Sequence, residues 1–189
     1  IWNISFQIAG AFFSVYIRSD LGLNYTTITL LGMVSSIAYI VSAKLWGHFA
    51  DKRSHVLTSM LSIGILCICH LLWFFSSGSN AIILLSIAHV LGGIAWSGIN
   101  VSLFNLQFDF TPQSKRTVYI GFSAAASGFI GYLAAVLGSS LVGIFGSTRI
   151  FLVFSSYDIK QILFLLSSLL LLICAGYIGI FMRRRKNHV

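Results

Sequence analysis

Leu45-Trp-Gly-His-Phe-Ala-Asp-Lys-Arg-Ser-His-Val-Leu57 is the stretch that decides the fold. Its charged residues form the densest group between any two apolar runs of the chain, and long, mostly apolar runs precede and follow it. A polar segment this short between two such runs is typical of a tight turn that joins two membrane-spanning helices. The stretch therefore predicts a membrane protein.

The composition of the whole chain favours the same class. Of its 189 residues, 57% are hydrophobic and only 8% are charged, Glu is absent, and the mean hydropathy is +0.92. Soluble domains carry far more charge. The net charge of +8 comes from basic residues at the ends of apolar runs, where loops meet anionic lipid headgroups. We therefore expect the lipid bilayer as a partner, and no nucleic acid.

The apolar runs predict the number of membrane crossings. A helix with a rise of about 1.5 Å per residue needs about 20 residues to cross about 30 Å of hydrocarbon. Six runs are of that order, although the first is short, so we expect an all-α polytopic protein made of a single six-helix bundle over residues 1–189. The predicted spans are residues 1–17, 27–49, 56–75, 81–106, 118–145 and 161–182, and a basic tail follows at 183–189.

The distribution of Lys and Arg predicts how the bundle is oriented. One side of the membrane holds nine of the 12 basic residues, whereas the other side holds Arg18, Arg149 and Lys160. By the positive-inside rule the richer side is cytoplasmic, which places both termini there, in a multi-pass protein of the cell (inner or plasma) membrane. The nine residues are Lys44, Lys52, Arg53, Lys115, Arg116 and residues 183–186.

Two loops carry a resemblance to a known family. Gly47, Ala50, Asp51 and Lys52 stand where the major facilitator superfamily of secondary transporters has the Gly-x-x-Ala-Asp-Arg/Lys of its signature loop. Ser54 and His55 replace the second glycine and a basic residue of that motif. In addition, the segment 104–116 resembles the loop between the fourth and fifth helices of bacterial members, through the Thr-Pro-x-x-x-Arg that ends at Arg116.

The resemblance implies roles for the residues of these loops. Gly47 would allow close helix packing, Asp51 would act as a latch that holds one conformation, and Lys52 and Arg53 would be its basic companions. Arg116 would be a gate contact that pairs with Asp51 or Asp109. The alternative interpretation is a solvated loop whose charges only set the topology.

The resemblance also implies an architecture and a partner. Each half of a family member consists of two inverted three-helix repeats, in which the first two helices line the cavity and the third lies outside. This chain would be one half, and the carboxyl-terminal half is favoured because the basic tail 183–189 ends it. Transport by alternating access would then require the missing N-terminal six-helix half or a second copy.

Polar residues at helical spacing identify candidate cavity surfaces. Asn3 and Gln7 lie on one face of the first run, Tyr39 lies in the second, and Trp96 and Asn100 lie on one face of the fourth. Amides are costly in hydrocarbon without a partner or water, so we expect these residues to line a cavity for a small organic solute. The alternative is that they make contacts between helices.

The fifth and sixth runs differ in composition. The fifth contains Gly128, Gly131, Ala134 and Gly138, and small residues at such spacing predict the close approach of a neighbouring helix. The sixth is nearly all Leu, Ile and Phe, and we expect it to face lipid.

Titratable groups inside the predicted spans are few. All Asp residues lie at or beyond helix ends, which leaves His70 and His89 as the possible proton sites within the membrane. We favour the interpretation that each is neutral and hydrogen-bonded to a neighbouring helix. Cys67, Cys69 and Cys174 lack partners at metal spacing, so we expect buried thiols rather than a disulfide, a metal site or a cofactor.

Several function classes stay open or are disfavoured. The chain lacks a nucleophile triad, paired catalytic carboxylates and a phosphate-binding glycine loop, so we expect no catalytic residues and no enzyme. The alternatives to a transporter are a membrane-embedded assembly subunit and, less favoured, an intramembrane enzyme that uses His70 or His89. Because the chain opens at Ile1 inside an apolar run without a signal peptide, we expect further residues upstream.

Overall fold

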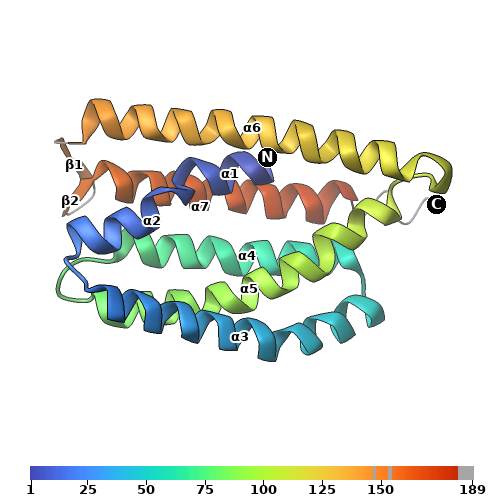
Figure 1. Cartoon of the computed structure of the whole chain (residues 1–189), viewed down its shortest axis with the longest axis horizontal. Coiled ribbons are helices and arrows are strands. Elements are labelled where there is room, and N and C mark those ends of the chain that lie inside the picture. Colours follow the sequence, from blue (N-terminus) through green and yellow to red (C-terminus); the bar gives the residue numbers. More distant parts are fainter. Residues whose placement is uncertain (147, 153–154, 183–189) are drawn as a thin grey trace.

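The computed structural model is an all-α bundle with a single small hairpin (Figure 1). It describes residues 1–146, 148–152 and 155–182, so the predicted basic tail at 183–189 lies outside the described residues. Five of the described helices are long and apolar enough to cross a membrane. The helices and strands are α1 (Trp2–Gly10), α2 (Phe12–Val15), the π-helical turn η1 (Tyr16–Asp20), α3 (Tyr25–Lys52), α4 (His55–Phe75), α5 (Ala81–Asp109), the 3-10 turn η2 (Gln113–Lys115), α6 (Arg116–Phe145), β1 (Arg149–Leu152), β2 (Ser155–Asp158), α7 (Ile159–Tyr177) and the π-helical turn η3 (Ile178–Met182).

The long helices lie side by side, with α6 along one edge of the bundle and α3 along the opposite edge (Figure 1). Helix α1 packs between α6 and α7, and α4 packs against α5 and α7, while α3 packs against α5. We call the end with the Arg53–Ser54 turn and the loop before α6 the motif end. The opposite end, with β1 and β2, is the hairpin end.

The first helical segment is interrupted, and Ile1 lies partway along the bundle. Its N-terminus lies about midway along the long helices, and the segment then runs to the hairpin end (Figure 1). Helix α1 stops at Gly10, and after Ala11 the chain continues as α2 and the π-helical turn that ends at Asp20. The single helix predicted for residues 1–17 is therefore divided into three short pieces.

The motif turn is tighter than its sequence suggests. Helix α3 continues to Lys52 and α4 begins at His55, so only Arg53 and Ser54 lie between them. The Ser54 side chain accepts a hydrogen bond from the backbone N–H of Val56 at 3.1 Å, which caps α4. A serine at this position therefore accepts a hydrogen bond from a free backbone N–H at the start of α4. Glycine has no side chain to do so.

The segment 146–160, predicted to be a plain loop, contains the antiparallel pair β1–β2. Arg149 lies opposite Asp158, and Tyr157 stacks on Phe74 with 4.4 Å between the ring centroids. Asp158 and Gln161 form a capping box at the start of α7. The strands were missed because they are only four residues long and follow directly on a helix.

Side chains from three segments close the hairpin end. The Nε2 of Gln161 donates to the carbonyl oxygens of Phe74 and Ser76 at 2.9 and 3.0 Å, and the hydroxyl of Tyr16 donates to Ser76 at 2.7 Å. Lys160 forms an ion pair with Asp20 at 2.8 Å. The last carbonyls of α4 are thus satisfied, as a buried helix end requires.

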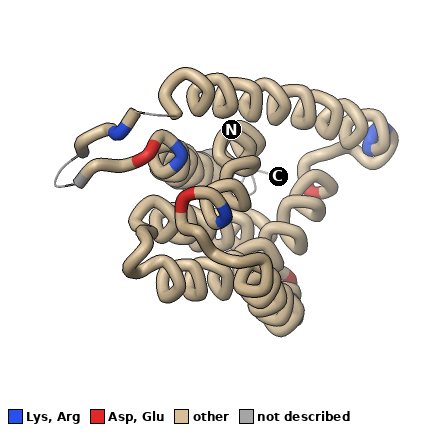
Figure 2. Tube along the Cα trace, turned by 60° about the vertical axis from the view of Figure 1, so that its left-hand side comes forward, with Lys and Arg blue, Asp and Glu red and all other residues tan. Residues whose placement is uncertain are grey.

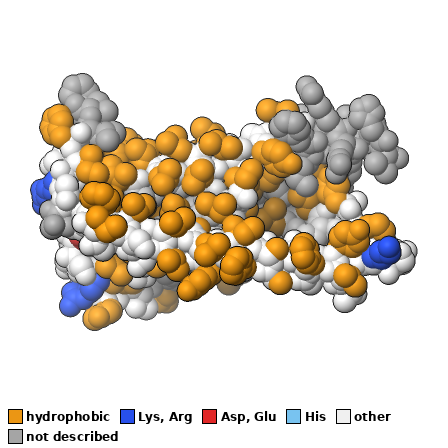
Figure 3. Space-filling view, turned by 90° about the horizontal axis from the view of Figure 1, so that it is seen from above, with side chains coloured by type: hydrophobic (Ala, Val, Ile, Leu, Met, Phe, Trp, Pro, Cys, Tyr) orange, Lys and Arg blue, Asp and Glu red, His pale blue; other side chains and the backbone are white. Residues whose placement is uncertain are grey.

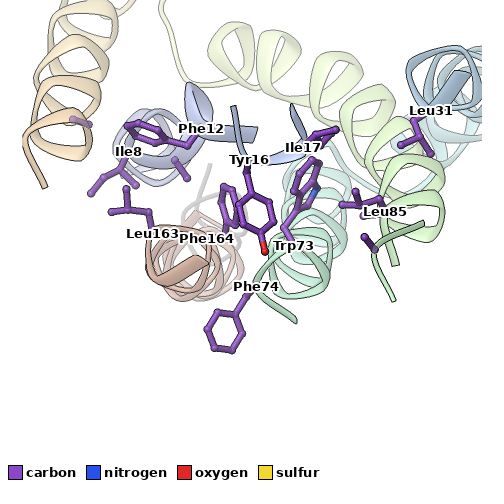
Figure 4. Close-up of a cluster of buried hydrophobic side chains, with 14 residues drawn as sticks. Ile8, Phe12, Tyr16, Ile17, Leu31, Trp73, Phe74, Leu85, Leu163 and Phe164 are labelled. Atoms are coloured by element: carbon purple, nitrogen blue, oxygen red, sulfur yellow. The ribbon is translucent and has the colours of Figure 1, made fainter. Parts of the chain in front are cut away.

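Two clusters of buried side chains hold the bundle together. The cluster toward the hairpin end joins α1, α2, η1, α4 and α7 around Phe12, Tyr16, Trp73 and Phe164, and α3, α5 and α6 also contribute to it (Figure 4). The second cluster joins α4, α5 and α7 with η3, and its members are Val56, Ile63, Leu66, Cys67, Cys69, Ala95, Ile99, Leu106, Leu171, Cys174, Ala175 and Ile178.

The expectation that the last helix faces lipid needs correction. Phe164, Ser167 and Leu171 of α7 are buried against α1 and α4, whereas Leu169 and Leu172 are exposed. The uniform Leu, Ile and Phe composition hid this division, because both faces of the helix look alike in the sequence. Helix α7 is therefore half core and half outer surface.

The outer surface of the bundle is apolar along its length and charged at its ends. Figure 2 shows Lys, Arg and Asp gathered at helix ends and connections, and Figure 3 shows hydrophobic side chains covering the face over α6. Only 11% of the apolar window of α3 and 17% of that of α6 are buried, against 56% for α4. This distribution is that of a multi-pass membrane protein, with α3 and α6 at its periphery.

The contact between α1 and α6 generates a prediction. A Cβ at Gly138 would overlap the carbonyl oxygen of Ile8, so Gly138→Ala must push the two helices apart. Overpacking of this kind costs about 1–3 kcal/mol, and we expect a lower melting temperature for the full-length protein in detergent. Gly143→Ala is the control, because a Cβ there has no neighbour within 4 Å. Equal melting temperatures for the two variants would show that α6 does not pack closely on α1 at Gly138.

Candidate functional site

A cavity of about 690 Å³ lies between α1, α5 and α6, on the motif-end side of the bundle. Its polar side chains carry amides and hydroxyls, and no Asp, Lys or Arg is among the residues that line it. Neutral hydrogen-bonding groups set among apolar ones are typical of a site for a small organic molecule. The polar lining residues are Asn3, Asn100, Gln107, Thr111, Tyr119, Ser123 and Ser127.

Helix α5 supplies one continuous wall of this cavity. Trp96, Asn100, Leu103 and Gln107 follow at intervals of three or four residues, which places them on one face of the helix. The amide of Asn100 donates to the hydroxyl of Tyr39 on α3 at 3.3 Å. Asn100 is thereby held at the cavity wall by a neighbouring helix.

An aromatic cluster closes the cavity toward the hairpin end. The Trp96 ring forms T-shaped contacts with Trp2 and Phe6, with centroid distances of 5.7 and 4.9 Å, and Trp2 stacks on Phe6. Beyond the cluster lies a second pocket of about 210 Å³, and Trp96 lines both. Trp96 is therefore the shared wall between two chambers of the bundle.

The structure places the predicted cavity residues at three kinds of position. Asn3, Trp96 and Asn100 line the cavity. Tyr39 lies outside the lining and joins it through Asn100. Gln7 also lies outside the lining, where its side chain would contact a Cβ at Gly131 of α6 at 3.2 Å.

Helix α6 also lines the cavity, although we did not predict this from its sequence. Tyr119, Ser123 and Ser127 line the cavity at intervals of four residues. That spacing was a usable signal, but the small residues of the same helix drew attention to helix packing instead. Trp2 was missed as well, because a single aromatic residue at the edge of an apolar run gives no periodicity to detect.

The signature loop, residues 47–55, lies at the motif end of the bundle. The side chains of Asp51, Lys52 and Arg53 are exposed. In the described part of the chain, Asp51 takes part in no ion pair, and a Cβ at Gly47 would have no neighbour within 4 Å. The close packing expected at Gly47 is therefore not found within this bundle, and the roles of these residues stay predictions.

The expected pairing of Arg116 with a carboxylate is replaced by another arrangement. Asp109, the last residue of α5, pairs with His55, the first residue of α4, at 3.1 Å between Oδ2 and Nδ1. The guanidinium of Arg116 instead lies over the Phe108 ring, 4.8 Å from its centroid, and donates to the Phe108 carbonyl. The packing of α4 against α5 brings His55 to Asp109.

The two intramembrane histidines bond differently. His70 Nδ1 lies 2.7 Å from the hydroxyl of Ser167 on α7, whereas His89 Nδ1 lies 2.8 Å from the carbonyl oxygen of Leu85 on its own helix. The three cysteines are buried free thiols, and Cys67 contacts the Ser168 hydroxyl at 3.2 Å. Within the described residues, no group of three or more His, Cys, Asp or Glu side chains is placed to hold a metal ion.

Comparison of the sequence with known proteins identifies a family and several relatives. The family model described as Major Facilitator Superfamily matches residues 3–189. A benzoate transport protein of Acinetobacter baylyi is 22% identical over 142 residues, which cover 72% of this chain and 30% of that protein. A hexose-6-phosphate:phosphate antiporter of Escherichia coli K12 is 26% identical over 135 residues, 70% of this chain and 28% of the antiporter. The chain thus spans under a third of the length of these curated relatives.

The polar cavity generates a labelling prediction. In the full-length protein in membranes, Asn100→Cys and Ser123→Cys are expected to react with a membrane-impermeant maleimide, because both positions line the cavity. Ser97→Cys, fully buried, and Leu169→Cys, exposed on the outer surface of α7, are expected to stay unlabelled. The native cysteines are buried and give little background. Unreactive Asn100→Cys and Ser123→Cys would show that the cavity is dry.

Proposed function

Because the chain belongs to the major facilitator superfamily, we propose that it forms one six-helix half of a transporter that moves a small organic solute across a membrane by alternating access. The observation that carries this proposal is the match of the Major Facilitator Superfamily model to residues 3–189, and the polar faces of α5 and α6 beside the cavity of about 690 Å³ support it. The family and the named relatives are transporters rather than enzymes, and the neutral lining of the cavity suits binding rather than catalysis.

The arrangement of the chambers supports the alternating-access part of the proposal. Such a carrier must bind its solute in a space that opens to one side of the membrane while a barrier closes the other. The cavity lies on the motif-end side, and the rings of Trp2, Phe6 and Trp96 close it toward the hairpin end. The aromatic cluster is in the position that the barrier of such a state requires.

The solute class follows from the lining. Asn3, Asn100 and Gln107 offer amide donors and acceptors, and Trp96 offers an aromatic face. This combination suits a small organic molecule with a polar edge. The relatives are named for benzoate and for hexose 6-phosphate, and these two compounds are the first solutes to screen.

The proposal requires a second bundle and fixes an orientation. Helices α3 and α6 expose most of their apolar surface, which is available to lipid or to another six-helix half of the same carrier or a second copy. We propose that the carrier lies in the plasma membrane. The motif end is cytoplasmic by the positive-inside rule, since Lys52, Arg53, Lys115 and Arg116 lie there.

Asp51 is proposed as a latch between the two halves. Its carboxylate is exposed on the last turn of α3 and has no ion-pair partner within the described residues. A carboxylate is stabilised by helix N-terminal amides and by basic side chains. If a second bundle presents either group at the motif end, Asp51 would bind it. This contact would hold the two halves together at that end.

The cavity proposal predicts a transport phenotype. We expect Asn100→Ala to raise the apparent KM for the transported solute about fivefold, because it removes one hydrogen-bonding group worth about 1 kcal/mol. Radiolabelled benzoate and hexose 6-phosphate uptake into proteoliposomes measures this. Asn105→Ala, five residues along α5 and outside the lining, is the matched control. A membrane subunit without transport activity would move neither solute in the wild-type protein.

The latch proposal predicts a rate effect. Asp51→Asn removes the charge and is expected to lower the maximal transport rate about fivefold, as the loss of about 1 kcal/mol of charge–dipole stabilisation implies. Asp51→Glu keeps the charge and should retain most of the rate. Expression and membrane insertion, followed by quantitative blotting, should be the same for both. Full uptake by Asp51→Asn would refute the latch.

A further inference from the structure

The second pocket, on the hairpin-end side of Trp96, combines two imidazoles with aromatic walls. Its volume is about 210 Å³, and the titratable residues that line it are Cys69, His70 and His89. No Asp, Lys or Arg is among the described residues of the lining. Its aromatic lining residues come from α1, α2, α4 and α5, and they are Phe6, Phe13, Trp73 and Trp96.

The hydrogen bond of His89 fixes which of its ring nitrogens carries the proton. Its Nδ1 lies 2.8 Å from the carbonyl oxygen of Leu85, and a carbonyl oxygen only accepts hydrogen bonds. The Nδ1 of His89 must therefore be protonated to make this bond. In the neutral ring, Nε2 then carries a lone pair that accepts hydrogen bonds.

Two consecutive hydrogen bonds fix the tautomer of His70 in the same way. The hydroxyl of Ser167 donates to the backbone carbonyl oxygen of Ser5, which uses the one proton of that hydroxyl. Ser167 must then accept the bond from His70, whose Nδ1 lies 2.7 Å away. The Nδ1 of His70 therefore carries the proton, and the Nε2 of His70 is also an acceptor.

Both Nε2 atoms have no hydrogen-bond partner among the described residues. They are not sealed among protein atoms, as the unpartnered hydroxyl of Ser97 is, so each is open to the pocket that its ring lines. His70 as a whole is only 2% exposed, which leaves the pocket as the open side of its ring. An acceptor that stays unpaired away from water is costly. The pocket therefore favours a molecule that donates a hydrogen bond.

The charge of such a molecule follows from the lining. An ion in this pocket would have no side chain of opposite charge among the described lining residues, and an unpaired buried charge is strongly unfavourable. The two imidazoles, in the neutral form that their hydrogen bonds allow, add only acceptors. A neutral donor suits the pocket better than a cation or an anion.

The walls indicate the shape of the molecule. The ring centroid of His70 lies 5.0 Å from that of Phe13, and the ring centroid of His89 lies 5.8 Å from that of Trp73, so each imidazole lies beside an aromatic side chain. Aromatic rings pack well against one another in stacked or edge-to-face geometry. The volume suits one ring, since an apolar protein cavity of about 150 Å³ binds benzene.

We propose that this pocket is a binding site for a small neutral phenol, separate from the solute cavity. The ring of the phenol packs among Phe13, Trp73 and Trp96, and its hydroxyl donates a hydrogen bond to the Nε2 of His70 or His89. A phenolic hydroxyl has a pKa of about 10, so it keeps its proton at neutral pH and donates it readily. No covalent bond changes on binding.

The site is tested by nuclear magnetic resonance of the full-length protein in lipid nanodiscs, with isotope-labelled histidine and with phenol as the probe. At about pH 8, where imidazoles are neutral, we expect the Nδ1–H tautomer at His70 and His89. Phenol should shift the Nε2 signal of at least one of them to a saturating limit. Toluene, which has the same shape without the hydroxyl, should not reproduce this shift.

Spectra of His70→Asn and His89→Asn assign the two signals, because each variant lacks one of them. Three results would overturn the proposal: the Nε2–H tautomer at both residues, the same Nε2 shift with toluene as with phenol, or no shift with phenol. The last result is expected if the pocket holds only water.

The contribution of the two acceptors is tested by equilibrium dialysis of radiolabelled phenol, with protein-free nanodiscs to subtract uptake by lipid. The double variant His70→Asn/His89→Asn keeps a donor near each Nδ1 position but lacks both Nε2 atoms. We expect it to bind phenol at least about tenfold more weakly than the wild type. His48→Asn, at an exposed position, is the matched control and should bind like the wild type.

Equal affinity of the double variant and the wild type would overturn the role of the imidazoles. If the double variant does not fold, the wild-type resonance experiment with phenol and toluene decides the proposal by itself. Neither experiment requires transport. A failure of the phenol site therefore leaves the proposed function standing, and a failure of that function leaves the site standing.

Discussion

Hydrocarbon offers no hydrogen bonds, so backbone polar groups inside a membrane need partners within the protein, and a polar side chain there is costly unless it has a partner or faces water. The helices satisfy the backbone in this way, and several hydroxyls follow the same rule by donating to their own helix, as Ser42 does to Ala38 and Ser140 does to Val136. Others bridge helices, as Ser59 does to Ser102. The amides of Asn3 and Gln107 lie at the cavity instead, which is why the proposed function depends on that cavity containing water.

The same constraint explains how one bundle contains two different chambers. Toward the motif end, neutral polar side chains of α5 and α6 line a large space. Toward the hairpin end, the pocket is small and aromatic, and its polar content is mainly the imidazoles of His70 and His89. Trp96 lines both chambers and lies between them. The large chamber suits binding of a solute, and the small one suits binding of a single aromatic ring.

Much of this fold followed from the sequence, because the length of an apolar run and the charges at its ends report directly on the bilayer. The end of α4 at Phe75 and the start of α5 at Ala81 were predictable for that reason. Contacts that depend on three-dimensional packing were not. The buried face of α7, the hairpin after α6 and the pairing of His55 with Asp109 leave no trace in local periodicity. The cavity wall on α6 was detectable, but packing glycines share its helix.

The most direct test of the account is an experimental structure of the full-length protein in a lipid nanodisc, determined with a transported solute. We predict a second six-helix bundle facing α3 and α6, and solute or water density beside Asn100 and Trp96 in the space between α1, α5 and α6. A space filled by hydrocarbon side chains of a neighbouring helix, with no path from it to either side of the membrane, would contradict the account.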